Sequence, residues 1–263
     1  MNKPIGFFRK IYLTLKTIKN SQSVFLDFCG FLNGKEIVYR TRSGSQIIAR
    51  GGSTDISEII VINADQEYPK KFFPKIDYPV IVDIGANIGT FSIYINEKLI
   101  NNNPCIYSVE PSLNNFNLLV KNIKINDFSI RCFNIAISDH NGEEFLDISS
   151  NFDAFKLSDH PTNQYEIVSV QTLESFCSTQ KINFIDLLKV DIEGGEYKVF
   201  HQSIDFIKTK VKAIFIEVHH LDNLENNLKV FKKYLISHNF QIEAEIRNST
   251  LFLLNRNLIK NNG

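Results

Sequence analysis

The segment with the clearest potential for chemistry is a glycine-containing turn that runs from Asp83 to Gly89. It follows the apolar run 80–82, and Gly85 and Gly89 permit a tight turn from strand to helix whose backbone N–H groups a polar ligand can approach closely. The dinucleotide fingerprint has a glycine where this turn has Asn87. A cofactor with a pyrophosphate group, such as NAD, is therefore disfavoured.

A second acidic residue, Glu110, ends the next apolar run, 106–109. An acidic side chain in that place can accept hydrogen bonds from both hydroxyls of a ribose, and Asp83 is suited to attract a cationic ammonium group. We expect Asp83 and Glu110 to face one crevice at the carboxyl ends of adjacent strands. S-adenosylmethionine has a ribose, an ammonium group and no phosphate, so it fits both residues.

Ionisable residues cluster at the ends of two later apolar runs, in Lys189-Val190-Asp191 and in Glu217-Val218-His219. Residues two apart share one face of a strand, so each pair points in one direction. Methyl transfer to a hydroxyl requires removal of the hydroxyl proton during attack. We expect Asp191 or His219 to be the general base, with Lys189 and Glu217 in the same catalytic group.

Two alternatives remain open for this cluster. Asp191, Glu193 and Glu217 could instead hold a divalent metal ion that orients a diol. A purely structural interpretation pairs Lys189 with Glu193 or Glu217 to neutralise buried charge, and makes Glu196 a cap of the next helix.

The elements that position these residues follow a strand, turn, helix, strand order after Pro79, which is typical of a parallel α/β sheet. Residues 139–171 read as an irregular insertion that shapes a pocket, with short strands near 145–148 and 167–170. Asn122 and Asn126 are expected to act locally, at the end of the second helix and in the turn that follows it. The expected strands are 80–82, 106–109, 130–137, 185–190 and 213–218, with a C-terminal antiparallel hairpin of 241–247 and 249–254 about Asn248.

Residues 1–78 are expected to form a small α+β extension, and residues 79–263 the main domain. Within 5–19, apolar residues recur at helical spacing, which predicts a helix that docks on the rest of the protein. Contact of this helix with an anionic membrane surface is the alternative. The apolar positions are Phe7, Phe8, Ile11, Leu15 and Ile18.

Composition narrows the function further. The chain of 263 residues has 29 Lys and Arg and 29 Asp and Glu, so no basic excess favours nucleic acid as a partner. The four cysteines are far apart and form no zinc or redox motif, which indicates free thiols in a reducing cytoplasm. The sequence does not indicate an oligomeric state.

Four segments together resemble the FkbM family of S-adenosylmethionine-dependent methyltransferases: VDIGANIGTFSIYI, YSVEPSLNNFNLLVKNIKIND, FIDLLKVDIEGGEYKVF and FIEVHH. This resemblance implies a class I, Rossmann-like sheet of seven mostly parallel strands, with a reversed last strand and helices on both faces. It also implies methylation of a hydroxyl on a sugar, a glycan or a small-molecule natural product.

The resemblance assigns cofactor roles to Asp83, Gly85, Asn87, Gly89, Glu110 and Ser138, the last beside the adenine ring. Tyr68 would cover the cofactor or simply pack. Two alternatives to an O-methyltransferase remain. One is a non-catalytic accessory protein in glycan assembly. The other is an N-methyltransferase of nucleic acid, which normally carries an N/D-P-P-Y/F tetrapeptide where this chain has Lys189-Val190-Asp191-Ile192.

Overall fold

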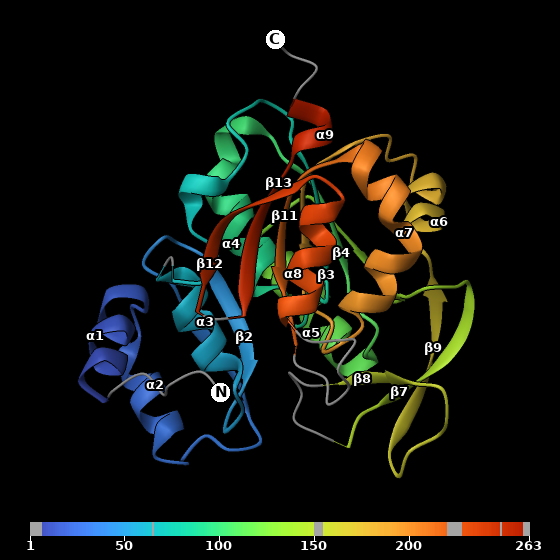
Figure 1. Ribbon diagram of the computed structural model, residues 1–263. Helices are drawn as coiled ribbons and strands as arrows, with labels where there is room; N and C mark the ends of the chain where they lie inside the picture. The colour runs from blue at the N-terminus through green and yellow to red at the C-terminus, as the bar shows by residue number, and fades with distance from the viewer. Residues whose placement is uncertain (1–6, 65, 150–154, 220–227, 248, 260–263) are drawn as a thin grey trace.

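The computed structural model describes residues 7–64, 66–149, 155–219, 228–247 and 249–259. Within them, seven strands form a central sheet in the order β12-β13-β11-β10-β3-β4-β5 (Figure 1). The parallel strands are β3 (Val80–Ile84), β4 (Cys105–Val109), β5 (Ile130–Phe133), β10 (Ile185–Val190) and β11 (Val211–Glu217). β13 (Thr250–Asn255) lies antiparallel between β11 and β12 (Phe240–Ile246). The predicted α/β sheet with its C-terminal hairpin is confirmed, whereas Asn248 lies outside the described residues.

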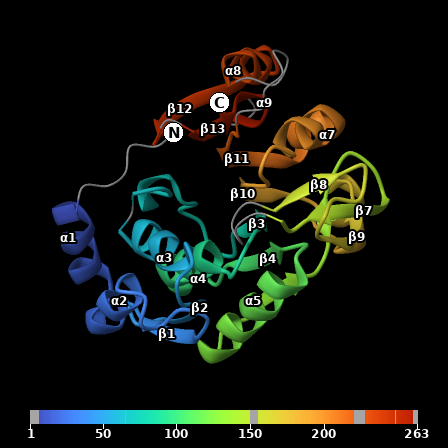
Figure 2. The ribbon, with the colours of Figure 1, turned by 90° about the horizontal axis from the view of Figure 1, so that it is seen from below.

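Helices cover both faces of this sheet (Figure 2). One face packs against α3 (Asp55–Asn63), α4 (Thr90–Leu99) and α5 (Leu113–Ile125), and the other against α6 (Leu173–Thr179), α7 (Glu196–Lys210) and α8 (Leu228–Ser237). Consecutive residues of a strand point to opposite faces, so Leu187 enters one apolar core and Leu188 the other. Strands that are buried on both faces read as continuous apolar runs, which is why these strands were predictable.

The expected strand 130–137 is wrong in its second half. β5 ends at Phe133, and the Asn134 amide donates to the backbone oxygens of Glu110 and Pro111, which draws the chain away from the central sheet. Residues 136–137 then start a second sheet in the order β6-β9-β7-β8. The short strands expected near 145–148 and 167–170 are confirmed within β7 (Gly142–Asp147) and β9 (Tyr165–Gln171), whereas β8 (Lys156–Ser158) was not predicted.

The N-terminal region contains α1 (Phe7–Thr17), α2 (Ser21–Phe28) and a hairpin of β1 (Glu36–Arg40) and β2 (Gln46–Arg50). The outer edge of β2 bonds to side chains of α5. The Asn126 amide accepts from the Gln46 N–H and donates to the Gln46 oxygen, and Asn122 bonds in the same way to Ile48. The purely local roles expected for these two asparagines are wrong, because each amide takes the place of a neighbouring strand.

The helix predicted within 5–19 is present, although residues 5 and 6 lie outside the described residues. It docks through Leu13, which is buried, while Ile11 and Leu15 are exposed. The helical periodicity thus identified the element and assigned Ile11 and Leu15 to the wrong face. Among the described residues, no helix is both long and apolar enough to cross a membrane.

Three short helices complete the chain: η1 (Lys70–Phe72), η2 (Ile100–Asn102) and α9 (Arg256–Ile259).

Candidate active site

A cavity of about 510 Å³ lies at the carboxyl ends of β3, β4, β10 and β11, where open α/β sheets bind ligands. Helices α1 and α3 and the second sheet form its other walls. The residues predicted from the sequence that line it are Tyr68, Gly85, Asn87, Glu110, Lys189, Asp191, Glu193, Glu217 and His219. Asp83, Gly89 and Ser138 do not line this cavity.

The glycine turn between β3 and α4 has a left-handed backbone at three positions, with φ of 76° at Gly85, 49° at Asn87 and 90° at Gly89. A Cβ atom on Gly85 would lie 1.8 Å from the backbone oxygen of Asp191. A Cβ atom on Gly89 would lie 2.6 Å from the Leu119 side chain. Both glycines are therefore required by the close approach of neighbouring segments as well as by φ.

The backbone N–H groups of this turn are already bonded within the protein. Those of Gly85 and Ala86 both donate to the Val109 oxygen at 3.0 Å, and that of Asn87 donates to Glu110 Oε2 at 2.9 Å. The expectation that these N–H groups are open to a ligand is wrong, because β4 lies directly beside the turn. Three N–H groups of the turn are thus unavailable to a phosphate, which related turns hold through such donors.

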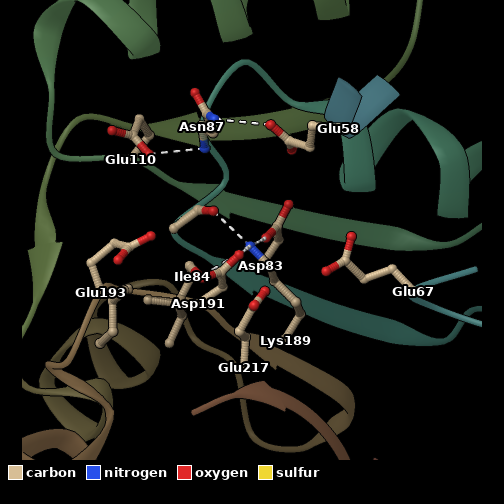
Figure 3. A network of polar contacts seen from close by, with 12 residues as sticks. Glu58, Glu67, Asp83, Ile84, Asn87, Glu110, Lys189, Asp191, Glu193 and Glu217 are labelled. Atoms are coloured by element: carbon tan, nitrogen blue, oxygen red, sulfur yellow. Dashed lines mark hydrogen bonds and ion pairs between the residues drawn. The ribbon is translucent and has the colours of Figure 1, made fainter. Parts of the chain in front are cut away.

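Glu110 follows β4 and is buried at the cavity wall (Figure 3). Its carboxylate accepts the N–H groups of Asn87 and Ser112, the latter at 3.0 Å, and the Asn115 amide at 3.4 Å. Burial raises the pKa of Glu110 to about 7, although these hydrogen bonds act in the opposite direction. The Asn87 amide donates to Glu58 at 3.0 Å, while its buried Oδ1 has no hydrogen-bond partner among the described residues.

Asp83 and Lys189 form a buried ion pair in the strands behind the turn (Figure 3). The Lys189 ammonium lies 3.3 Å from Asp83 Oδ1 and 3.6 Å from Asp191 Oδ2, and it donates to the Gly85 oxygen at 2.6 Å. Burial alone would lower the pKa of Lys189, but Asp83, Asp191 and other carboxylates raise it above its ordinary value. The expectation that Asp83 faces the ligand crevice is wrong, as is the expected pairing of Lys189 with Glu193 or Glu217.

His219 lies among three carboxylates at the end of β11. Its Nδ1 is 2.8 Å from Glu196 Oε1, and its Nε2 is 3.4 Å from Glu193 Oε1 and 3.9 Å from Asp191 Oδ1. Burial opposes the imidazolium charge, but these carboxylates raise the pKa of His219 to about 11. Glu196 also accepts the N–H groups of Ile192 and Gly194, which precede α7, so it holds this loop and His219 together. The expected capping of α7 by Glu196 is wrong, because no side chain among the described residues caps the start of that helix.

Glu217 lines the cavity as one of a pair of carboxyl groups, the other being Glu67. Its carboxyl group is hydrogen-bonded to Glu67 and accepts from the Ser249 hydroxyl at 3.1 Å. Burial and the nearby carboxylates of Asp191 and Glu67 raise the pKa of Glu217 to about 8. Arg247 lies 3.6 Å from Glu67 Oε2 and supplies a compensating positive charge.

The sequence of the chain matches a family of known proteins. Residues 83–248, more than half of the chain, match the methyltransferase FkbM domain. The chain belongs to the FkbM methyltransferase family. This result confirms the family resemblance of its sequence motifs.

Solved structures share the fold of this FkbM-family chain. The FkbM methyltransferase of Methylobacillus flagellatus matches with a TM-score of 0.51 at 14% identity, over 74% of this chain and 52% of that one. The chain thus spans about half the length of that protein. The precorrin-6y C5,15-methyltransferase of Geobacter metallireducens matches with a TM-score of 0.42 at 14% identity, over 70% of this chain and 82% of that one. A search of curated proteins by sequence gave no significant match.

Several residues at the FkbM-family cavity were missed or misplaced by sequence reasoning. Ser138 is buried away from the cavity, where its hydroxyl lies 3.2 Å from Glu144 Oε1. The apolar residues Ile135, Ala136 and Ile137 line the cavity in its place. Glu58 also lines it, and its only sequence signal was its position in a helical stretch before the glycine turn. Tyr68 packs between the rings of Phe91 and Phe215 and lines the cavity as part of its wall.

Two groups of three potential metal ligands occur among the described residues, each with ligand atoms within 4.8 Å of one another. One is Asp191, Glu196 and His219, and the other is Asp139, His140 and Glu144. Glu193 and Glu217, which the metal alternative required beside Asp191, belong to neither group. The expected metal set is therefore not assembled as a unit.

Proposed function

We propose that this FkbM-family chain is an S-adenosylmethionine-dependent methyltransferase that methylates a hydroxyl group of a sugar, a glycan or a small-molecule natural product. One observation carries the proposal. A single cavity has Glu110 and a turn with three internally bonded N–H groups on one wall, and Asp191 between two cationic side chains on another. The first wall suits a nucleoside without phosphate, and the second suits proton removal.

The residues present fit this cofactor. Glu110 keeps acceptor capacity for ribose hydroxyls beyond the N–H groups that it already accepts. The buried Oδ1 of Asn87 needs a hydrogen-bond donor, which a polar group of the cofactor would supply. Ile135, Ala136 and Ile137 offer an apolar wall for the adenine ring. When bound, S-adenosylmethionine supplies an activated methyl group on a sulfonium centre.

Asp191 is the best candidate for the general base. It lies 3.6 Å from the Lys189 ammonium and 3.9 Å from His219 Nε2, so two cationic side chains flank its carboxylate. His219 is protonated at neutral pH, because its pKa is about 11, so it has no lone pair with which to accept a proton. We therefore assign proton removal to Asp191, and assign Glu196 and His219 to its positioning.

The charge of the cavity favours a neutral, hydroxyl-rich acceptor. Glu58, Glu67, Asp191, Glu193 and Glu217 all line it. Carboxyl groups accept hydrogen bonds from hydroxyls, and those that are ionised repel phosphate or carboxylate groups. This wall supports a sugar-like acceptor and argues against the alternative of nucleic acid as a substrate.

The state of the cysteines is relevant to where in the cell the protein is located. Cys29, Cys105, Cys132 and Cys177 are all free thiols, which supports a reducing location such as the cytoplasm.

Isothermal titration with S-adenosylmethionine and with NAD tests the cofactor assignment directly. We expect measurable binding of the first and none of the second, and tighter binding of NAD would refute the proposal. Incubation with S-adenosylmethionine carrying a deuterated methyl group, followed by mass spectrometry of candidate sugars and natural products, tests the transfer itself. A protein that binds the cofactor and labels none of a broad acceptor panel would support the non-catalytic accessory alternative instead.

A further inference from the structure

Helices α1 and α2 and the loop that follows them expose an unusual number of large apolar side chains. Phe25 and Phe31 are each 67% exposed, and Tyr12 is 62% exposed. Ile11, Leu15 and Phe28 are exposed as well. We call this region, residues 9–35, the N-terminal surface. Both helices lie at the periphery of the molecule, away from the central sheet (Figure 2).

These exposed side chains are not the docking face of the helices. The same segment buries Leu13, Ile18 and Val24 against the rest of the protein. A helix that docks through one face normally presents polar residues on the other. Here large apolar side chains are also exposed away from the docking face, and a concentration of exposed apolar surface on a folded protein typically marks an interaction site.

The charge of the N-terminal surface is strongly one-sided. Residues 9–35 contain five Lys and Arg and a single carboxylate, whereas the whole chain has 29 of each sign. That carboxylate, Asp27, is buried and accepts hydrogen bonds from the Tyr39 hydroxyl and the Gly52 N–H, each at 2.7 Å. The exposed cations Arg9, Lys16, Lys19 and Lys35 are thus not balanced by an exposed acidic side chain of this segment.

One contact joins the two helices and the cavity. The Lys10 ammonium lies 4.0 Å from the centre of the Phe28 ring, so a cation of α1 covers an aromatic ring of α2. Lys10 and Leu13 also line the large cavity. The cavity therefore extends to the border of the N-terminal surface.

We propose that the N-terminal surface binds the headgroup region of an anionic lipid bilayer. Exposed Phe and Tyr rings insert favourably at the boundary between headgroups and acyl chains, and clustered Lys and Arg are attracted to anionic lipids. Helices of 11 and 8 residues would lie along the membrane plane. Because the cavity reaches this surface, docking would hold the cavity next to the membrane. The inference is independent of the methyl acceptor.

Vesicle flotation tests this proposal. We expect the protein to float with vesicles of phosphatidylcholine containing about 30% phosphatidylglycerol, to float poorly with phosphatidylcholine alone, and to dissociate at high salt. Phe25→Ser with Phe31→Ser, and separately Lys16→Glu with Lys19→Glu, should weaken binding about tenfold or more. The matched control is Ile167→Ser with Ile236→Ser, which removes exposed apolar side chains from other surfaces and should leave binding unchanged.

A second measurement covers the case in which a variant folds poorly. The chain contains no tryptophan, so Phe31→Trp introduces a single fluorophore in the N-terminal surface. Its emission should shift to shorter wavelength on anionic vesicles and not on neutral ones. Absence of both the shift and flotation would overturn the proposal. A dimer in light scattering that the Phe25→Ser and Phe31→Ser variant abolishes, without vesicle binding, would assign the surface to self-association instead.

Discussion

The ammonium of Lys189 lies 3.3 Å from Asp83 Oδ1, and Asp83 is completely buried. The protein itself therefore supplies the cation that the sequence interpretation had sought in a ligand. Lys189 also bonds to the Gly85 oxygen and approaches Asp191, so one buried charge ties the glycine turn to the candidate base. In the cofactor site that we propose, selectivity then depends on Glu110, Asn87 and the turn.

Lys189→Met should lower the free energy of unfolding by about 3–5 kcal/mol, because it leaves Asp83 buried without its partner. Urea denaturation followed by circular dichroism measures this change. The double variant Lys189→Met and Asp83→Asn should recover part of the loss. The exposed pair of Lys198 and Asp159 provides the control, and Lys198→Met should cost less than about 1 kcal/mol. Equal effects of Lys189→Met and Lys198→Met would contradict the role of the buried pair.

Gly85→Ala should destabilise the protein by roughly 3 kcal/mol or more, because the new methyl group meets the Asp191 backbone oxygen in a left-handed backbone. Gly44→Ala is the matched control. Gly44 also has positive φ, but nothing lies within 4 Å of its Cβ position. That substitution should cost only the backbone strain of roughly 1–2 kcal/mol. Thermal unfolding of both variants separates the two effects, and the explanation fails if they are equal.

Glu110→Gln should weaken S-adenosylmethionine binding by about tenfold or more, since it removes the ionised acceptor for the ribose hydroxyls. Calorimetric titration gives the affinity, and the melting temperature reports whether the fold is kept. Glu174→Gln changes an exposed glutamate outside the cavity and should bind the cofactor as the unmodified protein does. Unchanged affinity in Glu110→Gln would remove Glu110 from the cofactor site.

Asp191→Asn should reduce kcat by about 10²–10⁴, the usual contribution of a general base, with cofactor affinity changed only a few-fold. The measurement is methyl incorporation into an identified acceptor, at saturating cofactor. Asp159→Asn, an exposed substitution on another surface, should retain full activity. A fully active Asp191→Asn variant would show that proton removal occurs elsewhere or needs no base.

Glu217→Gln should change how stability depends on pH. The pKa of Glu217 is raised from 4.5 to about 8 on folding, so the unfolded chain loses this proton first as the pH rises. Glu217 therefore makes its full contribution to the free energy of unfolding below pH 4.5, and this contribution is lost as the pH approaches 8. The variant should therefore be more stable than the unmodified protein at pH 8, by roughly 1–3 kcal/mol, and similar to it at pH 4.5. Melting curves that show the same difference at both pH values would contradict this assignment.

Sequence reasoning succeeded where a feature depends on neighbours along the chain. The largely apolar run 185–190 predicted a buried strand, and the turn with Gly85 and Gly89 predicted a strand-to-helix junction. Glu110 and Asp191 could be placed at one cavity because the carboxyl ends of parallel strands share an edge.

It failed where a side chain is satisfied by a distant segment. The bond from Lys189 to Gly85 spans 104 residues, and those of Asn122 to Ile48 span 74 residues. No local spacing reports such partners. Ser138 was misplaced because the chain leaves the central sheet at Asn134, and this departure depends on a side-chain bond to the backbone of Glu110.

The asparagine amides along β2 have a further consequence for the behaviour of the protein in solution. A strand with open donors and acceptors on one side can recruit a strand from another molecule, which leads to domain exchange or fibril growth. Gln46 and Ile48 have no such vacancy, because Asn126 and Asn122 already occupy their outward hydrogen-bonding groups. Two amide side chains thereby protect a short, exposed hairpin from intermolecular aggregation.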